Sequence, residues 1–129
     1  MFVMIVILSR TGVTQTIADA LDEGLPVWKY GPLSFLAANV INNIPMSVLF
    51  SAILTAEGHT MSAAAVYATI IGSNVGAFLT PIGALAGIMW STMLKERGVK
   101  FSYLDFLKMG VTVALPALAA SLLVLWLVV

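Results

Sequence analysis

Long uncharged stretches dominate the polarity pattern of this chain. No Asp, Glu, Lys or Arg occurs from Pro32 to Ala56, from Met61 to Leu94 or from Met109 to Val129. A helix of roughly 20 apolar residues crosses the hydrocarbon core of a bilayer. Each block is therefore long enough to enter or cross a membrane, and the pattern predicts an all-α integral membrane protein.

The first thirty residues follow a different pattern. Met1–Leu8 is continuously apolar, but no basic region precedes it and no small-residue cleavage site follows it, unlike a signal peptide. We expect residues 1–9 to be the end of a truncated membrane helix. Residues 10–31 carry apolar positions at helical spacing from a cap near Thr14. They predict a short helix that lies either in the membrane interface or against the rest of the protein.

The longest block contains a poor helix former at its centre, Ile71–Gly87. Its helix-disfavouring residues are Gly72, Gly76, Pro81 and Gly83, and its polar residues are Ser73, Asn74 and Thr80. In lipid, unwound backbone is stable only where protein or a wet cavity covers it. One interpretation is a discontinuous helix at a transport site. The alternative is a kinked spanning helix whose glycines pack against a neighbour, because the glycines recur at small-xxx-small spacing.

The block Pro32–Ala56 has amides and a proline at its centre. These residues are Asn39, Asn42, Asn43 and Pro45. Polar groups at this depth are costly in lipid and are candidates for function, although amides that bond between packed helices explain them too. Hydropathy allows one kinked spanning helix, or two half-helices that enter and leave on the same side and meet at Asn42-Asn43-Ile44-Pro45.

Composition and charge narrow the class of protein. Hydrophobic residues make up 60% of the chain and charged residues 9%, against about 25% charged in ordinary soluble domains. The formal net charge is zero and cysteine is absent, which gives no basic face for nucleic acid and no thiolate metal site. We expect no metal and no cofactor. Without an acid–base pair, a phosphate loop or a nucleophile with its base, we do not expect an enzyme.

Cationic side chains set the expected orientation. Lys95, Arg97, Lys100 and Lys108 form the densest basic cluster of the chain. The bias of basic loops towards the cytoplasm places this turn inside. A last helix at residues 104–129 then crosses the membrane once and leaves the C-terminus outside.

Two motifs resemble those of a known family, the arsenical pump membrane proteins (arsenite permeases) of the ion transporter superfamily. Asn42-Asn43-Ile44-Pro45 is similar to the family's Asn-Asn-(Leu/Ile)-Pro element. The stretch from Gly72 through Thr80-Pro81-Ile82-Gly83 is similar to its second signature, which ends in Thr-Pro-Ile-Gly-Ser-Leu-Ala. Ala77 replaces the usual proline and Ala84 the usual serine. The resemblance covers roughly residues 33–129.

The resemblance implies a fold of two inverted repeats, of which this chain is the C-terminal one. That transport repeat comprises residues 32–129, with a re-entrant hairpin at 32–56, a broken helix at 61–94 and the last helix at 104–129. The N-terminal repeat is then supplied by the same or a separate chain. The implied location is the plasma membrane of a prokaryote, where the protein is multi-pass.

The implied activity is export of arsenite or antimonite by proton exchange. Asn42, Asn43, Asn74 and Thr80 are the expected substrate-binding residues, because amides and hydroxyls match the hydroxyls of the uncharged trihydroxide. Pro45, Gly72, Gly76, Pro81 and Gly83 are expected to shape the helix breaks. Neither broken block contains an ionisable group for proton coupling, so we expect that group in the N-terminal half.

Partners and rival functions follow from the same resemblance. The family's partners include a soluble arsenite-stimulated ATPase, and a homodimer is compatible with it. A sodium-coupled carboxylate or anion carrier of the same superfamily is one alternative, although this chain lacks the Ser-Asn-Thr triplet usual there. A non-transporting or truncated membrane subunit is the other.

Overall fold

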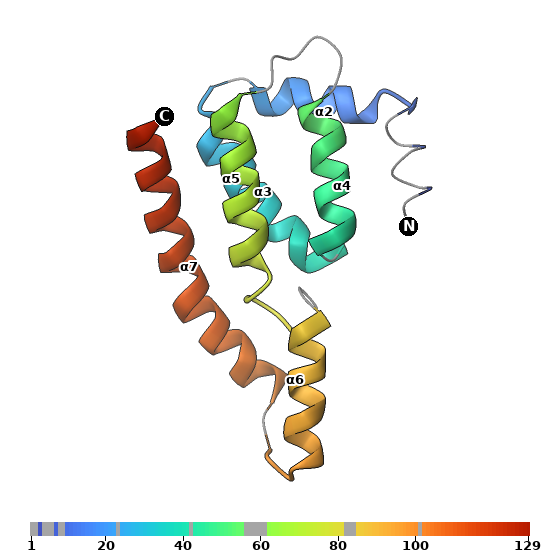
Figure 1. The fold of residues 1–129 in the computed structure, drawn as a ribbon, viewed down its shortest axis with the longest axis vertical. Helices are drawn as coiled ribbons and strands as arrows, with labels where there is room; N and C mark the ends of the chain where they lie inside the picture. Colours follow the sequence, from blue (N-terminus) through green and yellow to red (C-terminus); the bar gives the residue numbers. More distant parts are fainter. Residues whose placement is uncertain are drawn as a thin grey trace.

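The chain is entirely helical in the part that the computed structural model describes. That part comprises residues 3, 7, 10–22, 24–41, 43–55, 62–81, 85–100 and 102–129, without the side chains of Asp22, Asn43 and Leu85. The helices there are α2 (Val13–Asp22), α3 (Pro26–Ile41), α4 (Asn43–Leu54), α5 (Ala63–Gly76), α6 (Leu85–Glu96) and α7 (Tyr103–Val128) (Figure 1). The prediction of an all-α chain is confirmed. The helix end expected at residues 1–9 lies almost wholly outside the described residues.

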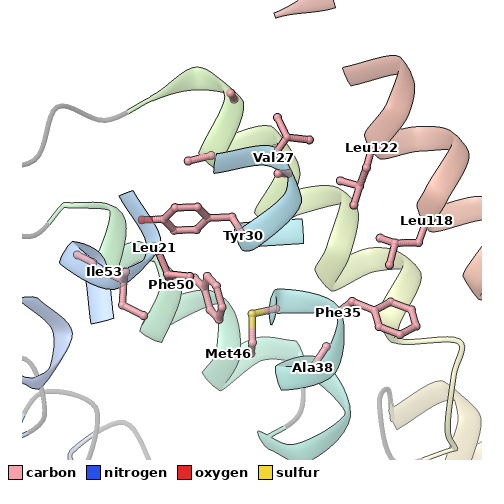
Figure 2. Close-up of a cluster of buried hydrophobic side chains, with 14 of the residues drawn as sticks. Leu21, Val27, Tyr30, Phe35, Ala38, Met46, Phe50, Ile53, Leu118 and Leu122 are labelled. Carbon is pink, nitrogen blue, oxygen red and sulfur yellow. The ribbon is translucent and has the colours of Figure 1, made fainter. Parts of the chain in front are cut away.

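Helices α3, α4 and α5 form a compact bundle, in which α3 and α4 run in opposite directions (Figure 1). Buried side chains between them include Phe35, Met46 and Phe50 (Figure 2). The rings of Tyr30 and Phe50 meet edge to face, with centroids 6.5 Å apart. Such aromatic pairs add stability beyond the area that they bury, so this contact ties the start of α3 to the middle of α4.

Small residues bring α3 and α5 unusually close together. A Cβ on Gly72 would overlap the Ser34 hydroxyl and the Gly31 carbonyl oxygen, and one on Gly76 would lie 2.5 Å from the Phe35 carbonyl oxygen. Helices in membranes associate through such small residues, because lipid provides no hydrophobic driving force between them. The first glycine pair therefore packs α5 against a neighbour and does not unwind it.

Helix α2 lies across one end of the bundle, where it contacts α3 and α4 (Figure 1). Ala18 and Leu21 of α2 are buried. The Lys29 ammonium donates a hydrogen bond of 2.9 Å to the Ala20 carbonyl near the end of α2, where free carbonyls favour a cation. Thr14, which the sequence suggests as the cap, is instead buried within α2. Of the two expected locations, the structure shows this helix packed against the protein.

Helix α3 begins earlier than the uncharged block suggests. It starts at Pro26 and includes Lys29, whereas the uncharged block begins at Pro32. Proline fits the first helical position because the backbone donor it lacks would have no partner there. Lys29 limits the uncharged block, but it does not end the helix, because its ammonium group reaches a carbonyl acceptor.

Helices α6 and α7 form an arm that extends from the bundle, and α7 returns along α5 (Figure 1). Gly98 has a φ of 72°, and the amides of Gly98 and Val99 bond back to the carbonyls of Lys95 and Leu94. This is the Schellman arrangement that terminates a helix at glycine. Ser102 and Asp105 then form a capping box at the start of α7.

Helix α7 has 26 residues and, among the described helices, is the one long and apolar enough to cross a membrane. It includes Pro116 in its interior. Its bounds nearly match the last helix expected at residues 104–129.

Candidate functional site

The predicted interruption of the longest apolar block lies between α5 and α6. Helix α5 ends at Gly76, and α6 begins at Leu85. Between them, turn-like hydrogen bonds join the amides of Phe78 and Leu79 to the carbonyls of Val75 and Gly76. Pro81, which is buried, comes next. Residues 82–84, and with them Gly83, lie outside the described part of the chain.

The side chain of Asn39, near the end of α3, bonds both to the end of α5 and to the segment that follows it. Its amide nitrogen donates to the Phe35 carbonyl at 2.9 Å and to the Gly76 carbonyl at 3.0 Å. Its amide oxygen accepts a hydrogen bond of 2.8 Å from the Thr80 hydroxyl. Gly76 is the last residue of α5, so one side chain of α3 fixes the end of a helix and the segment after it.

Helix α7 holds the same segment from another side. A Cβ on Gly110 would lie 2.7 Å from the carbonyl oxygens of both Phe78 and Leu79. Only glycine permits this approach of backbone to backbone. The segment at residues 77–81 therefore contacts both α3 and α7.

Asn74 lies in the last turn of α5, beside the interruption. Its amide nitrogen donates to the Ile70 carbonyl of its own helix at 2.8 Å, and among the described residues its side chain makes no other hydrogen bond. An asparagine amide has two N–H donors and one acceptor oxygen. Asn74 therefore retains a donor and its acceptor for a ligand, whereas Asn39 has used most of its capacity.

A pocket of about 540 Å³ opens beside Asn74, between the end of α5, α6 and the start of α7. Its lining residues are Asn74, Ala77, Phe78, Ala86, Gly87, Trp90 and Phe106. The rings of Trp90 and Phe106, which both line the pocket, meet edge to face with centroids 5.8 Å apart. None of the described residues that line it is ionisable, so this part of the pocket suits an uncharged solute better than an ion.

The other predicted site residues are placed as follows. The Thr80 hydroxyl donates to Asn39, Pro45 lies in the first turn of α4, and Gly72 and Gly76 lie in α5. Asn42 lies outside the described residues, as does the side chain of Asn43. The structure brings Thr80 together with Asn39, which the sequence marked only as one of three mid-block amides. Gly110 gave no signal of its own, because a glycine in an apolar helix is common in membrane proteins.

The helical fold, the apolar spanning helix and the interrupted helix clamped at the bundle's end are those of an integral membrane protein. The family model for arsenical pump membrane proteins matches residues 1–129, the whole chain. The chain belongs to the arsenical pump membrane protein family.

Relatives support the same assignment. The chain is 31% identical to the arsenical pump membrane proteins of Escherichia coli and Yersinia enterocolitica, over 95% of its own length and 30% of theirs. It is 27% identical to an uncharacterized transporter of Mycobacterium tuberculosis, over 98% of its length and 32% of that protein's. The chain thus spans less than a third of these curated relatives. No solved structure matches it.

Proposed function

We propose that this chain forms one part of a membrane carrier that exports arsenite or antimonite. The observation that carries the proposal is Asn74, an amide with unused hydrogen-bonding groups beside an interrupted helix and at the edge of a pocket. The family membership supplies the class of substrate. The site supplies a physical means of recognising an uncharged solute that carries hydroxyl groups.

The lengths of the helices favour a re-entrant hairpin and a discontinuous helix. At 1.5 Å per residue, α3 and α4 are about 24 and 18 Å long, and α5 and α6 about 21 and 18 Å. A hydrocarbon core is about 30 Å thick, so none of the four spans it alone. In our proposal, α3 and α4 enter and leave on the same side, and α5 and α6 meet at the interruption within the membrane.

Recognition of the substrate follows from the chemistry of the groups at the break. The trihydroxide of trivalent arsenic offers hydroxyl donors and oxygen acceptors, and an asparagine amide complements both. Asn74 is exposed in this chain. Once the rest of the carrier covers it, an amide that regains its hydrogen bonds only with such a ligand discriminates against apolar molecules. Asn42, Asn43, Asn74 and Thr80 remain our proposed substrate-binding residues, and Thr80 already donates its proton to Asn39.

Coupling and assembly complete the proposal. The interruption and its pocket carry no ionisable side chain among the described residues, so proton exchange takes its titrating group from the remainder of the carrier. The N-terminal repeat, in the same or a separate chain, closes the site. A soluble ATPase and a second copy are further proposed partners.

Replacement of the matched segment of the Escherichia coli relative by this chain tests the proposal. We expect arsenite-sensitive cells that express the chimera to accumulate less arsenite than cells with an empty vector, and the Asn74→Ala chimera to lose the difference. A chimera inserted at parental levels that leaves arsenite accumulation unchanged contradicts the proposal. Citrate or succinate uptake by the same cells, without arsenite export, would favour the carboxylate carrier instead.

A further inference from the structure

A second hollow, lined by both hydroxyl-bearing and apolar side chains, lies on another side of α5. It is a groove of about 230 Å³ between α4 and α5. Its hydroxyl-bearing residues are Ser47, Ser51, Thr55, Thr69 and Ser73. The groove is separate from the pocket beside Asn74, with which it shares no lining residue.

The hydroxyls of α4 form a continuous line. Ser47, Ser51 and Thr55 recur every four residues, which places them on one face of the helix. Eight residues of helix extend about 12 Å. The line therefore runs from the second turn of α4 to the residue that follows its end at Leu54.

The facing hydroxyls belong to α5 and are buried. Thr69 donates to the Ala65 carbonyl at 2.8 Å, and Ser73 donates to the Ile70 carbonyl at 3.0 Å. Both hydroxyls have used their only proton, so their oxygens remain as acceptors. Ser73 lies about one turn before the end of α5, so the groove comes within about one helical turn of the interruption.

The side-chain hydroxyl of Ser51 has no partner within the described part of the chain. The Thr55 hydroxyl, in contrast, donates to the backbone carbonyl of Ser51 at 2.7 Å. A hydroxyl without a partner costs free energy in an apolar medium. A groove of this volume holds several water molecules, each of which takes about 30 Å³ in the liquid. Water or a hydroxylated solute would satisfy Ser51 and the free acceptors of α5.

We propose that this hydroxyl groove is a water-filled approach by which a small, uncharged, hydroxylated solute reaches the interrupted helix. The assignment of that solute as arsenite rests on the proposed function, but the hydration of the groove does not. A transported trihydroxide would exchange its hydrogen bonds to water for bonds to successive hydroxyls of the groove. It would therefore keep hydrogen-bonding partners while it crosses the apolar layer.

Single cysteines test the hydration. The chain has no cysteine, so Ser47→Cys, Ser51→Cys and Thr55→Cys each introduce one thiol with almost no change in volume. Val48→Cys is the matched control, because Val48 is exposed on α4 but does not line the groove. The thiolate, which forms only where water reaches, attacks a small, charged, water-soluble thiol-reactive reagent.

We expect the three groove cysteines of the full chain in membranes to react, and the Val48 cysteine to remain largely unmodified. Groove cysteines that stay unmodified, or a Val48 cysteine that reacts equally fast, would overturn the proposal.

Export by the chimera tests the role of the groove in transport. Ser51→Leu fills the groove and removes a hydroxyl, so we expect at least about a tenfold loss of arsenite export, because the solute loses a hydrogen-bonding partner on its way. Val48→Leu should leave export unchanged. Full export by an inserted Ser51→Leu chimera would exclude the groove as the approach. If the parent chimera exports no arsenite but the labelling pattern holds, the proposed function fails and the hydrated groove stands.

Discussion

At the scale of single residues, two asparagines near the interruption have opposite hydrogen-bonding states. Asn39 bonds to the Phe35 and Gly76 carbonyls and to the Thr80 hydroxyl, while Asn74 makes one bond within its own helix. The first amide is committed to structure, and the second has groups available to a ligand. Substitutions at the two positions should therefore separate stability from transport.

Asn39→Ala should lower the thermal stability of the detergent-purified protein. It leaves the Gly76 carbonyl and the Thr80 hydroxyl without this partner, at a cost of about 1–3 kcal/mol for each group left unsatisfied. Asn74→Ala is the matched control, because it removes only a bond to the Ile70 carbonyl. It should leave the melting temperature nearly unchanged while arsenite export by the chimera is lost. Equal losses of stability in the two variants would contradict this division.

At the scale of helices, close packing of α3 against α5 positions the interruption. Gly76 meets backbone atoms of Phe35, and Gly72 meets the Gly31 backbone as well as the Ser34 hydroxyl. Backbone atoms cannot rotate away as a flexible side chain can. Any added bulk must move one helix relative to the other. Because Asn39 lies on α3 and bonds to Gly76, such a shift also disturbs the clamp on the break.

Gly76→Ala should destabilise the protein by about 1–3 kcal/mol, the usual cost of overpacking a tight interface. A lowered unfolding temperature in detergent would show the effect. Ala63→Val adds volume to the same helix at an exposed position and should cost much less. A Gly76→Ala protein as stable as its parent would show that α3 and α5 separate freely.

At the scale of the whole molecule, the two ends of α7 define the two faces of the protein. The turn at residues 97–100 lies at one end, and the C-terminus and α2 lie together at the other (Figure 1). The basic turn favours the cytoplasmic face for its end. A re-entrant hairpin then leaves α2 on the outer face with the C-terminus, whereas a single crossing by α3 and α4 would not.

Labelling of single cysteines from outside the cell should distinguish these topologies. We expect Leu25→Cys and Val129→Cys to react with an impermeant maleimide in intact cells, and Val99→Cys to react only after permeabilisation. All three positions are exposed. A Leu25 cysteine protected in intact cells while that of Val129 reacts would exclude the re-entrant hairpin.

The sequence predicted the fold class and the last helix well, because apolar periodicity and length determine both. It predicted an interruption near Pro81 for the same reason: glycine, proline and buried amides together are poor helix in lipid. It left open whether Gly72 and Gly76 unwind the helix or pack it against a neighbour, since both kinds of glycine look alike in sequence. Asn39 was recognised as costly in lipid, but its bond to Thr80 depends on the tertiary arrangement.

The approach of Gly110 to Phe78 and Leu79 has a mechanical consequence. Because the carbonyl oxygens of Phe78 and Leu79 lie directly against Gly110, no side chain separates the 77–81 segment from α7 at this point. The 77–81 segment and the adjoining turn of α7 must therefore be displaced as one rigid body, and a change at either end of α7 is transmitted to the loop that holds Thr80.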